Sequence, residues 1–103
     1  GPLPLAAGSD TVFDVVGRCG IPAGASAISA NLTAVDPTAN GHLRLYPSGA
    51  VRPGASVLNF SVGRTLANNA IARLGADGRI AVYAGLASGT THLIIDVSGY
   101  FLE

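Results

Sequence analysis

The sequence has no lysine, no tryptophan and a single cysteine, and few of its residues are charged. Only 12% of its 103 residues carry a charge, and six basic residues balance six acidic ones to a net charge of +0. Without surplus positive charge, the chain lacks the attraction for phosphate that nucleic-acid binders and polybasic membrane anchors use. Apolar stretches run for only a few residues, as in Leu93-Ile94-Ile95, whereas roughly 20 are needed to span a bilayer. We therefore expect no nucleic-acid partner and no membrane insertion.

The few histidine and cysteine side chains limit the chemistry that the chain can perform. Cys19 cannot form a disulfide within this sequence, and no cysteine and histidine cluster has the spacing of a metal site. His42 and His92 could join an acidic residue and a serine in a catalytic triad, because triads are defined by geometry and not by chain order. However, the sequence has no Gly-x-Ser-x-Gly elbow, and both histidines fall in expected strands. We expect no enzyme activity, no cofactor and no metal.

Apolar residues make up 49% of the chain, so residues 1–103 can bury a core as a single domain. Glycine and proline recur too often for long helices, whereas alternation of apolar and polar residues is frequent. In Ala27–Val35, for example, Ile28 and Leu32 would face a core while Ser29 and Thr33 face away. The other expected strands are Thr11–Val16, His42–Tyr46, Val57–Phe60, Asn69–Leu74, Arg79–Ala84 and His92–Phe101.

The segments between these strands contain turn-forming residues. Asp36–Gly41 and Ala76–Gly78 are expected to be hairpin loops, with Asp-Gly supplying positive φ in the second. Many short strands at regular spacing indicate an all-β sandwich or barrel-like fold with about seven short antiparallel strands. We expect its core to contain Leu32, Leu43, Leu45, Leu58, Ile80, Val82, Leu93, Ile95 and Val97.

Several short motifs follow one another in a distinctive order. They are Asp36-Pro37-Thr38-Ala39-Asn40-Gly41, Leu43-Arg44-Leu45-Tyr46-Pro47, Ala67-Asn68-Asn69-Ala70, Leu74-Gly75 to Gly78, Gly89-Thr90-Thr91-His92-Leu93 and Asp96-Val97-Ser98-Gly99-Tyr100-Phe101. Their order and spacing resemble β-rich modules of secreted and cell-surface bacterial proteins, which often occur in tandem or beside hydrolases. The resemblance covers nearly the whole chain from Leu5. It implies a non-enzymatic extracellular or cell-surface module with a structural or adhesive role.

The resemblance also has a consequence for Cys19. Related modules usually begin with a segment containing Asp-Thr-Arg, often preceded by a cysteine, and this sequence has no such segment. The resemblance therefore implies that a first segment lies outside the sequence. Cys19 is accordingly a candidate for a disulfide with an upstream cysteine.

The low charge of the chain leads to a functional expectation. A domain of about 100 residues leaves roughly a third of its chain surface exposed, and here most of that surface is uncharged. We expect a homo-oligomer, either a ring such as a trimer or a fibre, with Val51, Val62, Leu66 and Leu86 as candidate contacts. The alternative is a module that binds a glycan or surface polymer through His42, Arg44 and Tyr46.

Overall fold

The computed structural model describes residues 3–17, 20–52, 54 and 56–102, and every helix or strand assigned in these ranges is a β-strand. The all-β class expected from the sequence is confirmed. The strands are β1 (Leu3–Ala6), β2 (Ser9–Asp14), β3 (Ala25–Val35), β4 (Gly41–Pro47), β5 (Leu58–Phe60), β6 (Leu66–Arg73), β7 (Arg79–Leu86) and β8 (Thr90–Leu102).

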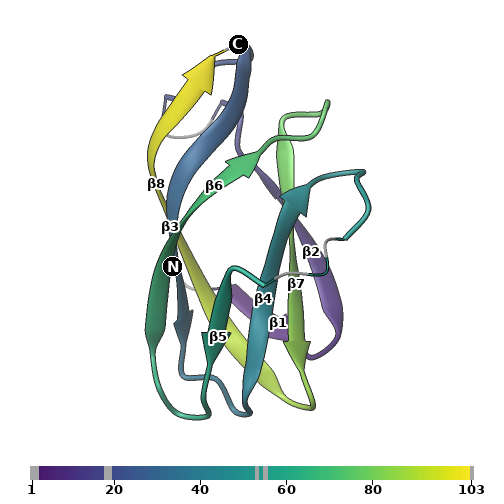
Figure 1. The fold of residues 1–103 in the computed structure, drawn as a ribbon, viewed down its shortest axis with the longest axis vertical. Coiled ribbons are helices and arrows are strands. Elements are labelled where there is room, and N and C mark those ends of the chain that lie inside the picture. The colour runs from purple at the N-terminus through teal and green to yellow at the C-terminus, as the bar shows by residue number, and fades with distance from the viewer. Residues whose placement is uncertain (1–2, 18–19, 53, 55, 103) are drawn as a thin grey trace.

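The strands form two antiparallel four-stranded sheets that pack as a sandwich (Figure 1). Sheet A has the order β1-β8-β3-β6, and sheet B has the order β2-β7-β4-β5. The two longest strands, β3 and β8, pair along most of their length at the centre of sheet A, from Val35 opposite His92 to Ala25 opposite Leu102.

The core lies between the sheets and follows the alternation of the sequence. In β3, Ile28 and Leu32 are buried while Ser29 and Thr33 face outward, as predicted. Among the expected core residues, Leu45, Ile95 and Val97 are partly buried and pack against the core. The remaining ones are fully buried: Leu32, Leu43, Leu58, Ile80, Val82 and Leu93.

The prediction that Asp36–Gly41 and Ala76–Gly78 form hairpins is wrong. The first segment joins β3 of sheet A to β4 of sheet B, and the second joins β6 of sheet A to β7 of sheet B. Their turn chemistry is nevertheless present, because Asp36 has φ 47 and Gly78 has φ 73. Among the described strands, only the β4–β5 connection joins neighbours in one sheet. The turn-forming residues therefore indicated correctly where the chain reverses, but not which strands pair with each other.

Strand β1 was not expected from the sequence. It contains Pro4, which has no amide hydrogen to donate to a ladder, and it lies at the edge of sheet A, where proline is tolerated. Its residue Leu5 is buried in the core at 1% exposure. Strand β1 covers one flank of β8, from Leu3 opposite Leu93 to Ala6 opposite Thr90.

Candidate functional site

The outer face of sheet B carries a group of aromatic and charged side chains, which we name the Tyr83 cluster. Strand register brings Asp10 of β2 and Arg44 of β4 to either side of Tyr83 on β7. Alternation along β4 adds two further side chains to this face, and the β4–β5 connection adds an arginine. The cluster consists of Asp10, His42, Arg44, Tyr46, Arg52 and Tyr83.

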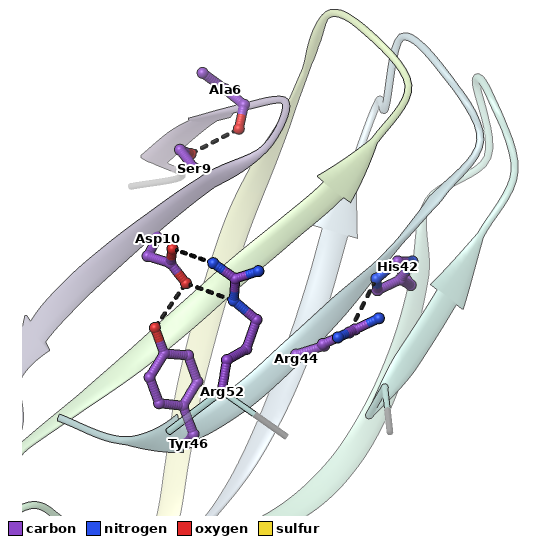
Figure 2. Close-up of polar contacts among 7 residues, drawn as sticks. All are labelled: Ala6, Ser9, Asp10, His42, Arg44, Tyr46 and Arg52. Carbon is purple, nitrogen blue, oxygen red and sulfur yellow. Dashed lines mark hydrogen bonds and ion pairs between the residues drawn. The ribbon is translucent and has the colours of Figure 1, made fainter. Parts of the chain in front are cut away.

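Asp10 is the acceptor that holds the cluster together (Figure 2). The Tyr46 hydroxyl donates to Asp10 Oδ1 at 2.6 Å. The Arg52 guanidinium donates to both carboxylate oxygens, from Nη2 to Oδ2 at 2.8 Å and from Nε to Oδ1 at 3.3 Å. This two-point geometry is the strong form of an arginine–carboxylate pair. It fixes the β4–β5 connection against β2.

The Tyr83 ring lies beneath two arginines. The Arg52 Cζ is 3.8 Å from the ring centroid, and the Arg44 Cζ is 5.6 Å from it. Both distances are within the range of cation–π attraction. The ring face under Arg52 is therefore occupied by the protein's own side chain.

His42 packs over the backbone of Gly85, its register partner on β7. A Cβ atom at Gly85 would overlap the imidazole ring, so the absence of a side chain creates the space that His42 fills. Arg44 Nε donates to His42 Nε2 at 3.2 Å. Because arginine is only a donor, this contact requires an unprotonated Nε2.

Within the cluster, hydrogen bonding shifts three pKa values. The Tyr46 hydrogen bond, assisted by Arg52, lowers the pKa of Asp10 below its ordinary 3.8 against a smaller opposing effect of burial. The same hydrogen bond raises the pKa of Tyr46 above 10.0. Asp10 raises the pKa of Arg52. The carboxylate, phenol and guanidinium therefore hold one another in their neutral-pH protonation states.

The structure does not bring the two histidines together. His42 belongs to sheet B, whereas His92 lies on β8 of sheet A beside Pro4 and Val35. The His92 Nδ1 atom is buried and has no hydrogen-bond partner. In the described ranges, no group of three or more His, Cys, Asp or Glu residues could hold a metal ion.

A second feature, which sequence reasoning missed, is a group of exposed apolar side chains at the end of sheet A, where β8 finishes beside the start of β3 (Figure 1). Ile71 on β6 is 70% exposed, and on β8 Tyr100, Phe101 and Leu102 are 46%, 45% and 63% exposed. Ile71 and Phe101 lie on the outer face of sheet A, whereas Tyr100 and Leu102 alternate to the other face. We name these four residues the end patch. A shallow hollow beside it is lined by Ser26, Ala27, Ile71, Arg73 and Phe101. The sequence signal was the run of three large apolar residues, which alternation cannot place on one inner face.

The four residues predicted as self-association contacts differ in their exposure. Val51 and Val62 are exposed, at 91% and 57%, while Leu66 is partly buried against the core. Leu86 is only 7% exposed and belongs to the core, so its prediction as a contact is wrong. The sequence reading ended this strand at Ala84, but β7 continues to Leu86 and turns that side chain inward. Cys19 lies outside the described residues.

No family model matches the sequence, and no curated protein matches it at a significant level. In the part of the chain that the structure describes, no helix is long and apolar enough to cross a membrane.

Proposed function

We propose that this domain is a non-enzymatic structural or adhesive module that self-associates, as a ring such as a trimer or as a fibre, on the outside of a bacterial cell. The observation that carries the proposal is the end patch, where four large apolar side chains are exposed at one end of sheet A. The extracellular location is drawn from the resemblance of the sequence motifs.

The surface properties of the molecule support self-association. Large exposed apolar patches on soluble proteins mark interaction sites, because leaving them in water is unfavourable. Two further apolar side chains, Val51 and Val62, are also exposed. With a net charge of +0, copies of the chain do not repel one another through their overall charge. The same surface is therefore available on every copy with little electrostatic cost to bringing copies together.

Light scattering across a dilution series tests this function directly. We expect a mass above the 10.2 kDa of one chain at micromolar concentration, and rings or filaments in electron micrographs. The association should persist at high salt, because apolar contacts are not screened. A monomer at every concentration, with no assemblies in the micrographs, would contradict the proposal.

Glycan or surface-polymer binding is the second candidate, and the clustering of His42, Arg44 and Tyr46 with Tyr83 on one face favours it. Arginine and tyrosine are side chains that contact sugars through hydrogen bonds and ring stacking. Against it, the Tyr46 hydroxyl and Arg52 are engaged with Asp10, and Arg52 covers Tyr83. Saturable binding on a glycan array that is lost in Arg44→Ala would establish this function, and no binding would exclude it for the glycans tested.

A further inference from the structure

The two sheets expose four edge strands, and three of them carry features that discourage pairing with another chain. Strand β1 has four residues including Pro4, and β5 has only three residues. Strand β2 carries acidic residues at Asp10 and Asp14. Strand β6 has eight residues, no proline and no acidic residue, and its one charged residue, Arg73, is the last. It is the edge that is least protected.

The hydrogen-bonding groups of β6 can be assigned to its two sides. Within the described residues, β6 pairs with β3 alone, in regular register from Ala27 opposite Arg73 to Ala34 opposite Leu66. The Asn69 amide is hydrogen-bonded at 3.0 Å to the side-chain Oδ1 of Asn68, which places that amide on the side away from β3. Because backbone groups alternate between the two sides of an antiparallel strand, the amides of Ile71 and Arg73 face the same open side.

We infer that β6 pairs antiparallel with β6 of a second copy of this chain, about a two-fold axis at Ile71, so that sheet A continues from one molecule into the next. This inference rests on the proposed self-association and names one of its contact surfaces, because a two-fold contact by itself joins only two copies and a larger assembly needs a second contact. The axis places the backbone groups of Ile71 opposite those of Ile71 in the second copy. Asn69 then lies opposite Arg73 of the second copy.

The side chains of β6 favour a second copy as the occupant. Ile71, 70% exposed on the outer face, meets its own counterpart at the axis, and the hollow that it shares with Phe101 lies beside it. Each Arg73 faces an uncharged asparagine. The two Arg73 residues are four positions apart, about 14 Å at 3.4 Å per residue, which exceeds the screening length of about 8 Å at physiological salt. Self-pairing therefore joins apolar surface without opposing like charges.

Pairing requires one local rearrangement. Asn68 bridges the two sheets at this edge, because its Nδ2 donates to the Val57 carbonyl at 2.8 Å while its Oδ1 holds the Asn69 amide. A partner strand would take over the Asn69 amide. Because the two-fold axis lies at Ile71, the Asn69 amide is at the end of the new ladder. The replacement of its hydrogen bond to Asn68 therefore leaves the pairing at Ile71 undisturbed.

Two matched lysine variants test the contact. Ile71→Lys places a charge at the axis of β6, and Val12→Lys places one on β2, where Val12 is 50% exposed. In sedimentation velocity at micromolar concentration, we expect Ile71→Lys to lower the average mass, by about twofold where the two-fold contact alone joins the copies, and Val12→Lys to leave it unchanged. Far-ultraviolet circular dichroism checks that both variants fold.

A cross-link gives a second, independent measurement. With Cys19→Ser as background, Ile71→Cys should form a covalent dimer under mild oxidation, because directly opposite residues have Cα atoms about 5.5 Å apart, within disulfide reach. Val12→Cys should remain largely monomeric. If the wild type associates but Ile71→Lys does so equally, the strand pairing is wrong while self-association stands. If the wild type is a monomer, both are wrong.

Discussion

At the scale of single residues, Asp10 is the side chain that anchors the Tyr83 cluster. Its carboxylate receives a tyrosine hydroxyl from β4 and an arginine from the β4–β5 connection. The side chains of Arg52 and Asp10 are 40% and 34% exposed, so solvent weakens their attraction. The contribution of Asp10 is therefore to position Arg52 and Tyr46 more than to stabilise the fold as a whole.

Asp10→Asn should alter the pH dependence of stability at both extremes. Because folding lowers the pKa of Asp10, its contribution is present above pH 3.8 and is lost as the pH falls through the lowered value. Folding raises the pKa of Tyr46, so its contribution is present below pH 10.0 and is lost as the pH rises through the raised value. Thermal unfolding at a series of pH values should show a shallower decline for Asp10→Asn in both ranges. Superimposable profiles for the variant and the wild type would contradict this.

Leu32→Ala should be strongly destabilising, because Leu32 is 1% exposed in the core between the sheets. Removing a large buried side chain costs about 2 to 5 kcal/mol of unfolding free energy, through lost burial and a residual cavity. The control Val51→Ala, at a position 91% exposed, should change stability by less than about 0.5 kcal/mol. Urea denaturation measures both. Equal effects of the two substitutions would mean that the inner face has been wrongly assigned.

At the scale of elements, the sequence predicted which side of a strand is buried better than it predicted which strands pair. Alternation assigned the inner face of β3 correctly, because burial acts on each second residue whichever strand lies beside it. The two predicted hairpins failed because pairing depends on strands distant in the chain, and β1 was missed because Pro4 disfavours a ladder except at an edge.

The candidate site was predictable to a similar extent. Alternation in β4 placed His42, Arg44 and Tyr46 on one face. Neither Asp10 nor Arg52 could be added, because their positions depend on the pairing of β2 with β7 and on the path of the β4–β5 connection. Sequence patterning therefore gave the β4 side chains of the cluster but not Asp10 and Arg52, which anchor it.

The packing of β4 on β7 gives a test at this scale. Gly85→Ala should displace the His42 imidazole, since a Cβ atom would occupy its place, and should cost about 1 to 3 kcal/mol as other overpacked sites do. Combining it with His42→Ala should recover much of that loss. The double-mutant cycle is measured by urea denaturation. Additive effects would show that the two residues are not coupled.

At the scale of the whole molecule, the sandwich has one continuous core. Its two buried clusters are joined by Phe13, Leu45 and Ile95, which pack against both. Residues from both sheets contribute to each cluster, for example Leu32 with Leu43 and Ile28 with Ile80. Neither sheet can therefore lose its packing without exposing the other.

A single unfolding transition should follow from this shared core. Thermal melts followed by far-ultraviolet circular dichroism and by tyrosine fluorescence should coincide, as two-state unfolding requires. The spectrum of the folded protein should show strand without helix, since the described ranges contain none. Measurements are made under dilute conditions, so that dissociation does not add a second step. Separate transitions for the two probes would indicate sheets that unfold independently.

The crossing of the chain between sheets has a consequence for how the protein folds. Strand β3 can complete its place in sheet A only after β6 and β8 are available, and β8, the last of the eight described strands in chain order, lies between β1 and β3. Closing such long loops costs conformational entropy before the strands gain any favourable contacts. Proteins with this connectivity therefore fold in milliseconds to seconds. During synthesis, sheet A therefore stays incomplete until β8 has been made. A chain that passes an export channel unfolded would complete its fold only on the far side.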